Sequence, residues 1–152
     1  MQFPVSRLDA DSLDFSYSGL KTALLHAVRG RPVGRGRDAT FERDGSELTQ
    51  TQRADLAASF QHAAVSALRL KIERALDRVD VHALIIGGGV SANSRVRSEL
   101  QHCCDEAGIE LRLPAPQYCM DNAAMIAGLA HPLLDAGRIA DATLSAAARS
   151  CN

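Results

Sequence analysis

The pattern of apolar and polar positions is most regular between residues 49 and 79, where an apolar residue recurs every three or four positions. This spacing places the apolar side chains on one side of an α-helix, and Thr49 followed by Gln52 has the form of a capping box at its start. The pattern therefore predicts a long amphipathic helix from about Gln52 to Val79. Its apolar stripe consists of Leu56, Phe60, Ala63, Ala64, Ala67, Leu68, Ile72, Ala75, Leu76 and Val79.

A shorter helix is predicted upstream in "SGLKTALLHAV". Leu20, Leu24 and Leu25 have helical spacing, and Ser18 is a favourable N-cap, so the helix is expected from Ser18 to about Val28. The next segment, residues 29–47, contains glycine, proline and charges of both signs without an apolar period. It is therefore expected to be a flexible loop.

The second half of the chain alternates between strands and helices. "HALIIGG" predicts a short buried strand, "SANSRVRSELQHCCDEAG" a helix that ends at Gly108, and "IELRLP" a second strand. "DNAAMIAGLAHPLLDAG" predicts a last helix with Asp121 at its cap and a kink or break near Pro132. This order indicates the α/β class with parallel strands, but two strands are too few for a complete sheet, which suggests that further strands belong upstream.

Composition limits the class of protein without naming a function. The 152 residues, 46% hydrophobic and 23% charged, fit one globular domain, and 17 basic against 18 acidic residues give no global signal for a nucleic-acid partner. No apolar run approaches the roughly 18 residues of a membrane span, and no signal sequence is visible, so a cytoplasmic protein is expected. The cysteines, which form no C-x-x-C pair, are expected to be reduced, with two of them packing in a helix. They are Cys103, Cys104, Cys119 and Cys151.

Three consecutive glycines, Gly87 to Gly89, follow the first predicted strand and allow two interpretations. Glycines at this point let a phosphate approach the backbone, and the N-terminus of the following helix would favour an anion. Gly87, Gly89 and Ala92 fit a loose dinucleotide fingerprint, but the next strand ends without the acidic residue that would bind a ribose. The alternative is a tight turn in which glycine serves packing.

Other polar residues also have a structural and a functional interpretation. Asp121 could cap a helix or provide an oxygen ligand to a metal, although the histidines show no H-x-x-x-H spacing for a complete site. Ser18 with Lys21 could hold an anion or simply begin a helix. A basic cluster in the 29–47 loop could be solvated or could contact phosphate. It consists of Arg29, Arg31, Arg35 and Arg37.

Four segments together resemble the C-terminal part of one family, the tRNA threonylcarbamoyladenosine transferases (TsaD), formerly called O-sialoglycoprotein endopeptidases. They are "LDFSYSGLKTALL", "QTQRADLAASFQHAAVSALRLKIERAL", "IIGGGVSANSRVRSEL" and "YCMDNAAMIAGLA", within about Phe15 to Gly137. The resemblance implies an incomplete actin-like lobe of the ASKHA, ribonuclease-H-like type, helix-rich with a small parallel sheet. Residues 1–152 would then form a single partial domain, the C-terminal portion of the second lobe.

The resemblance also implies roles for particular residues. Asn93 matches the family's substrate-binding asparagine, Gly88 and Gly89 line the nucleotide, and Asp121 matches a carboxylate that ligates a divalent metal, iron or zinc. The family's histidine pair and phosphate-binding glycine segment have no counterpart here, so the chain alone is not expected to retain the metal. Met120 stands where the family usually has threonine, and Tyr17 where it usually has phenylalanine.

By resemblance, the complete enzyme transfers a threonylcarbamoyl group from threonylcarbamoyl-adenylate to the exocyclic amine of the adenosine 3′ of the anticodon in tRNA. The implied partners are tRNA and TsaB- and TsaE-like proteins, and the isolated chain is expected to be inactive. A truncated paralogue that binds nucleotide or another protein is the alternative. A protease is disfavoured because no Ser/His/Asp or Cys/His set and no H-E-x-x-H motif is present. An open sheet edge and an exposed apolar helix face predict a homo-oligomer.

Overall fold

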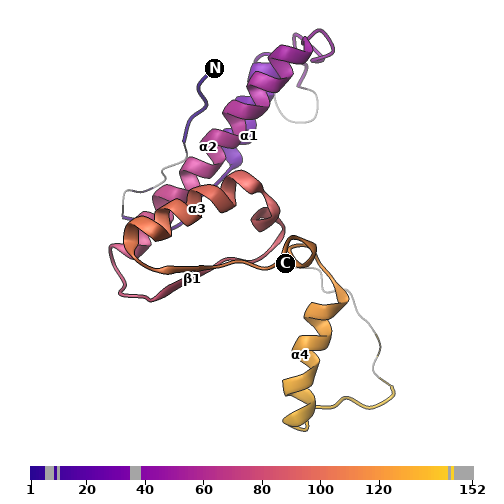
Figure 1. Ribbon diagram of the computed structural model, residues 1–152. Coiled ribbons are helices and arrows are strands. Elements are labelled where there is room, and N and C mark those ends of the chain that lie inside the picture. Colours follow the sequence, from indigo (N-terminus) through magenta and orange to yellow (C-terminus); the bar gives the residue numbers. More distant parts are fainter. Residues whose placement is uncertain (6–8, 10, 35–38, 144, 146–152) are drawn as a thin grey trace.

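The computed structural model describes residues 1–5, 9, 11–34, 39–143 and 145. This part of the chain contains four α-helices and a parallel pair of short strands, with α1 and α2 side by side and α3 between α2 and the strands (Figure 1). The last helix, α4, stands apart from the other three (Figure 1). In chain order the elements are α1 (Ser18–Arg29), α2 (Gln50–Leu76), β1 (Ala83–Ile85), the 3-10 turn η2 (Gly89–Ala92), α3 (Ser94–Ala107), β2 (Glu110–Arg112), the 3-10 turn η3 (Pro116–Tyr118) and α4 (Ala123–Asp135).

The capping box predicted at the start of the long helix is confirmed. The Gln52 amide donates to Thr49 Oγ1 at 3.2 Å, and the Thr49 amide donates to Gln52 Oε1 at 2.9 Å. These two bonds satisfy donors that the first turn of a helix would otherwise leave unpaired. The helix ends at Leu76, three residues before the predicted end.

The N-cap predicted for the first helix is wrong. Ser18 is the first helical residue of α1, and Tyr17 precedes it without a side-chain cap. The hydroxyl of Ser16 takes the expected role, since its Oγ accepts from the Ser18 amide at 3.2 Å. Tyr17 joins the two helices, because its hydroxyl donates to the Ala64 carbonyl of α2 at 3.3 Å. Burial raises the pKa of this phenol above its usual value.

The two predicted strands pair in parallel, as expected from the strand, helix, strand order. Leu84 lies opposite Leu111, and α3 makes the crossover between the strands. Neither strand has a second neighbour within the described residues, and Ile85 in β1 is 73% exposed. The helix-rich architecture with a two-stranded parallel sheet is consistent with the partial actin-like α/β lobe that the resemblance implies.

Two small hydrophobic clusters hold the helices together. Phe3 and Leu20 pack with Ala63 between the N-terminal segment, α1 and α2. Val96 and Leu100 of α3 pack with Val65 of α2, and this second cluster reaches the sheet. The helical position predicted for Cys103 and Cys104 is confirmed, because both are free thiols buried in α3, whereas Cys151 lies outside the described residues.

A charged cluster joins α2 to α3 beside the second hydrophobic group. Arg69 of α2 donates to Glu73 at 2.6 Å, to Glu99 of α3 at 3.2 Å and to Glu106 at 3.0 Å. The hydrogen bond from Arg69 is the main reason why the pKa of Glu99 is lowered, and the charge of Arg95 adds to the effect. One guanidinium therefore links the middle and the C-terminal end of α3 to the C-terminal half of α2.

The segment predicted as a flexible loop has contacts at its base. Val33 pairs with Thr40 in an antiparallel bridge, and the Arg29 guanidinium lies 4.6 Å from the centre of the Phe41 ring. Arg43 donates to the Ala27 carbonyl at 3.4 Å. Two members of the basic cluster, Arg35 and Arg37, lie outside the described residues, so flexibility and phosphate contact stay predictions.

The last helix differs from its prediction at both ends. Asn122 is the N-cap of α4, since its Oδ1 accepts from the Met125 amide at 3.1 Å; the cap predicted at Asp121 is therefore wrong by one residue. The helix also continues beyond Pro132 to Asp135, so the predicted break does not occur.

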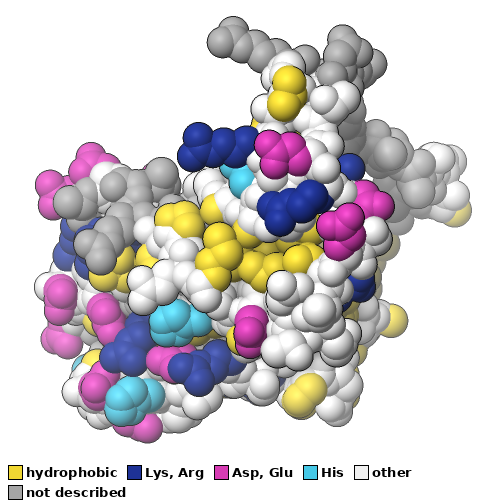
Figure 2. All heavy atoms as spheres, turned by 90° about the horizontal axis from the view of Figure 1, so that it is seen from above, with side chains coloured by type: hydrophobic (Ala, Val, Ile, Leu, Met, Phe, Trp, Pro, Cys, Tyr) yellow, Lys and Arg dark blue, Asp and Glu magenta, His cyan; other side chains and the backbone are white. Residues whose placement is uncertain are grey.

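No residue of α4 is buried, although Ile126 and Leu129 are apolar. Figure 2 shows a group of exposed apolar side chains on one face of the molecule, with charged side chains around them. Within the described ranges, no helix is long and apolar enough to cross a membrane.

Candidate functional site

The three glycines lie at the carboxyl end of β1. Pairing with the second strand extends one residue beyond β1, since the Ile86 amide donates to the Arg112 carbonyl at 3.1 Å. The chain then turns into η2, and the turn is fixed by Ser91, whose amide and hydroxyl both donate to the Gly88 carbonyl, at 3.0 and 2.6 Å. Ser91 is fully buried, whereas the glycines are exposed. The turn thus presents its backbone at the sheet edge where ligands of α/β proteins bind.

Each glycine of the turn has a different structural need. Gly88 has a φ of +81° and a ψ of 170°, a conformation that side chains rarely adopt. A Cβ on Gly89 would lie 3.3 Å from the Met120 sulfur. Gly87 has neither a positive φ nor any described atom within 4 Å of a Cβ placed on it. The positive φ accounts for glycine at position 88, and the Met120 sulfur limits the space for a side chain at position 89, but neither reason applies to Gly87.

Asn93 is the N-cap of α3. Its Oδ1 accepts from the Arg95 amide at 2.9 Å and the Val96 amide at 3.2 Å, and its Nδ2 donates to Gln61 Oε1 at 3.2 Å. The helix begins at Ser94, three residues later than predicted. The expectation of free helical N–H groups directly after the glycines is therefore wrong, because η2 intervenes and the Asn93 side chain satisfies two of the first amides of α3. Nδ2 carries a second N–H that could still bind a substrate.

A pocket of about 360 Å³ opens beside Asn93, between α1, α2 and the start of α3. Its volume is within the range of sites for small molecules. The walls are mostly apolar, with four polar side chains among them: Tyr17, Lys21, Gln61 and Asn93. The remaining lining residues are Phe60, Ala64, Val65, Val90 and Val96.

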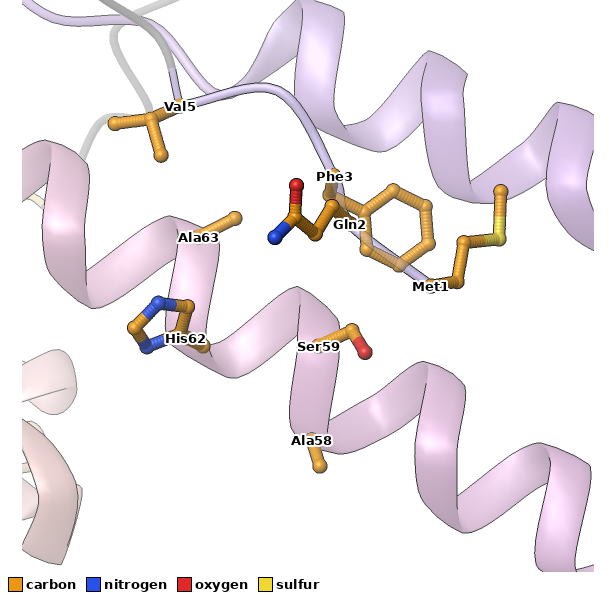
Figure 3. Close-up of a pocket in the computed structure, with 8 residues that line it drawn as sticks. All are labelled: Met1, Gln2, Phe3, Val5, Ala58, Ser59, His62 and Ala63. Carbon is orange, nitrogen blue, oxygen red and sulfur yellow. The ribbon is translucent and has the colours of Figure 1, made fainter.

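A larger pocket of about 500 Å³ lies on a different face of α2, where the N-terminal segment runs along the helix (Figure 3). Phe3 and Val5 line it from the segment, and Ser59 and His62 from the helix. None of the residues predicted to bind nucleotide or metal lines this pocket, so the smaller one beside Asn93 is the better candidate.

Asp121 is exposed and directly follows Met120, whose sulfur lies 3.3 Å from the position of a Cβ on Gly89. In the described part of the chain, no three His, Cys, Asp or Glu side chains come together as a group that could hold a metal ion. One carboxylate does not make a metal centre, so the described residues do not fit the expected iron or zinc ion without other ligands.

Arg97 also belongs to this region, although its sequence context gave no sign of it. Its Nε donates to the Ser91 carbonyl at 2.6 Å, and its Nη2 to the Pro114 carbonyl at 2.6 Å and to Cys119 Sγ at 3.2 Å. Pro114 and Cys119 are 17 and 22 residues away in sequence, so no local pattern could indicate these contacts. Gln61 was missed for the same reason.

The architecture and the turn define the class of the protein: a partial actin-like α/β lobe with a bare glycine turn between its first strand and the following helix. The sequence matches the family model of TsaD, tRNA N6-adenosine threonylcarbamoyltransferase, over residues 1–128, and the chain belongs to this family. The family resemblance deduced from the four segments is confirmed.

Two curated relatives carry the name tRNA N6-adenosine threonylcarbamoyltransferase. The protein of Anaeromyxobacter sp. (strain Fw109-5) is 45% identical over 130 residues, and that of Desulfotalea psychrophila (strain LSv54 / DSM 12343) is 39% identical over 127 residues. Each alignment covers 84% of this chain and 34% of the relative. The chain therefore spans about a third of the length of these relatives.

Proposed function

We propose that this chain is the C-terminal part of a transferase that modifies adenosine in tRNA with a threonylcarbamoyl group. In this reaction the exocyclic amine of the adenosine 3′ of the anticodon attacks the carbamoyl carbon of threonylcarbamoyl-adenylate. A carbon–nitrogen bond forms, the bond from the carbamoyl carbon to the phosphate oxygen breaks, AMP leaves, and the amine loses a proton. The names of the curated relatives and the family match support this class of reaction.

The chain's own contribution would be to hold the adenylate. The observation that carries this proposal is the backbone of Gly87, which neither packing nor conformation requires to be bare. A phosphate could approach there, and the nucleoside could enter the pocket of about 360 Å³ beside Asn93. The free N–H of Asn93 and the ammonium group of Lys21 would then face the substrate from two sides of the pocket.

Asp121 would supply one oxygen ligand to a divalent metal ion, iron or zinc, with the other ligands coming from outside these 152 residues. Since one carboxylate is insufficient, the isolated chain would bind the metal weakly and would transfer no threonylcarbamoyl group. tRNA and TsaB- and TsaE-like proteins are proposed as partners of the complete enzyme.

Nucleotide binding can be tested with two substitutions of Asn93. Asn93→Asp keeps the oxygen that caps α3 but removes the amide N–H, whereas Asn93→Ala removes both. Calorimetric titration with AMP should show weak binding to the parent chain and weaker binding to both variants. If all three chains bind AMP equally well, Asn93 is not a ligand.

The expected inactivity of the isolated chain has its own test. If the purified chain alone transfers a threonylcarbamoyl group from threonylcarbamoyl-adenylate to tRNA, that expectation is wrong.

Transfer activity can be tested in a chimaera. This chain replaces the corresponding C-terminal third of the Anaeromyxobacter relative, and threonylcarbamoyl transfer to tRNA is measured. The chimaera should be active and should lose activity with Asp121→Asn. Asp121 is exposed, and its replacement leaves Asn122, the N-cap of α4, unchanged. A folded but inactive chimaera would count against the proposal.

A further inference from the structure

The Arg97 side chain joins three segments that are separate in sequence. Arg97 lies in the first turn of α3, and its acceptors are Ser91 at the end of the glycine turn, Pro114 after the second strand, and Cys119 after η3. The acceptor distances of 2.6, 2.6 and 3.2 Å are those of well-formed hydrogen bonds from a guanidinium. Cys119 is 3% exposed, so the hydrogen bond from Arg97 Nη2 to its sulfur is shielded from solvent.

These contacts connect the two parts of the candidate site. Ser91 is two residues from Gly89, and Cys119 is two residues from Asp121. In the part of the chain that the structure describes, the side-chain hydrogen bonds between the 114–122 segment and the glycine turn with its helix come from Arg97. The two segments also approach each other at Met120, whose sulfur lies 3.3 Å from the position that a Cβ on Gly89 would occupy.

The geometry of the guanidinium group, whose N–H groups form a planar fork, explains why this residue is arginine. The acceptors of Arg97 are two carbonyl oxygens and a sulfur. No described carboxylate oxygen lies within 4.0 Å of a guanidinium nitrogen of Arg97, so it forms no salt bridge with the described residues. A guanidinium presents several N–H groups in fixed directions in one plane, so it can bind several acceptors at once. A lysine at this position would keep the positive charge, but its ammonium group could not donate to three acceptors in these fixed directions.

We propose that Arg97 is a positioning residue, which holds the segment carrying Asp121 at a fixed place beside the glycine turn. The role rests on the proposed transferase function, in which the glycine turn holds the adenylate and Asp121 acts next to it. A displacement of about 1 Å between reacting groups can cost on the order of a hundredfold in rate, so such an anchor would matter to an enzyme.

The chain offers a direct test, because it contains three methionines. With ¹³C-methyl-labelled methionine, the parent should show a nuclear Overhauser cross-peak between the Met120 methyl group and Gly89. Arg97→Gln removes the charge and the fork, and Arg97→Lys removes only the fork; both should lose the cross-peak. Arg112→Gln, at an exposed pair with Glu110, is the matched control and should retain it.

Addition of AMP then separates positioning from folding. In the parent, AMP should shift both the Gly88 amide and the Met120 methyl signal, whereas in Arg97→Lys the Gly88 shift should remain and the Met120 response should disappear. The proposal is overturned if the cross-peak persists in either Arg97 variant, or if circular dichroism shows that both variants are unfolded. If AMP shifts no parent signal, the nucleotide function fails, while the cross-peaks still report on Arg97.

Discussion

The sharpest prediction concerns Gly87 and its neighbour Gly88, which differ in why they are glycine. A methyl group on Gly87 meets no described atom within 4 Å, and its backbone does not require a positive φ. Gly87→Ala should therefore raise the free energy of unfolding by about 0.4–1 kcal/mol, because alanine restricts the unfolded chain. Gly88, with a φ of +81°, should lose about 1–3 kcal/mol when replaced by alanine.

Thermal unfolding and AMP titration of both variants test this reasoning. Each kcal/mol corresponds to roughly 2–4 °C in Tm for a chain of this length, so the two variants should shift in opposite directions. Despite its higher Tm, Gly87→Ala should bind AMP at least about tenfold more weakly, a loss of about 1.4 kcal/mol, because the methyl group occupies the proposed approach of the phosphate.

Two results would refute it. If Gly87→Ala unfolds at a clearly lower temperature than the parent, this glycine serves packing after all. If the variant is stable and binds AMP as the parent does, the ligand does not approach the backbone at this position. Arg112→Gln, at an exposed ion pair, is a control that should change neither property.

Three further predictions follow from the contacts. Asn93→Ala should lower the free energy of unfolding by about 0.5–2 kcal/mol through loss of the α3 cap, whereas Asn93→Asp should retain most of it; equal urea midpoints would contradict this. The lowered pKa of Glu99 means that its bond to Arg69 stabilises the fold above the ordinary pKa of 4.5 and is lost as the pH falls through the lower folded value. Glu99→Gln should therefore flatten the loss of stability below pH 4.5 in urea titrations, and an unchanged slope would exclude this carboxylate as a source. Because one edge of β1 has no partner among the described residues and α4 has an exposed apolar surface, light scattering should show a dimer or larger oligomer, and a monomer at micromolar concentration would count against this.

Local patterns were sufficient for the elements themselves. The helical period and the Thr49 capping box predicted α2, an apolar run before the glycines predicted β1, and the segment after Gly108 predicted β2. Two of the errors at helix starts arose where two capping residues lie close together. Ser16 competes with Ser18, and Asn122 with Asp121, and the sequence does not show which oxygen will reach the first free amides.

The candidate site was only partly predictable, because its geometry depends on contacts distant in sequence. The glycines, Asn93 and Asp121 were singled out beforehand, but the connection from the turn to the Asp121 segment runs through Arg97 and Met120. In "SRVR" an arginine has the ordinary pattern of a solvent-exposed helix position. Its acceptors are supplied by the tertiary fold, which a local pattern does not encode.

The isolation of α4 makes the helix itself a reporter of assembly. Its 13 residues include Gly128 and Pro132, and helices of about this length are marginal in water unless a packed surface supports them. Since the helix buries no residue within the described chain, its hydrogen bonds must compete with solvent until a partner surface covers the apolar side chains. Helix content should thus rise with protein concentration or on addition of that partner, and folding of α4 and association become one coupled equilibrium.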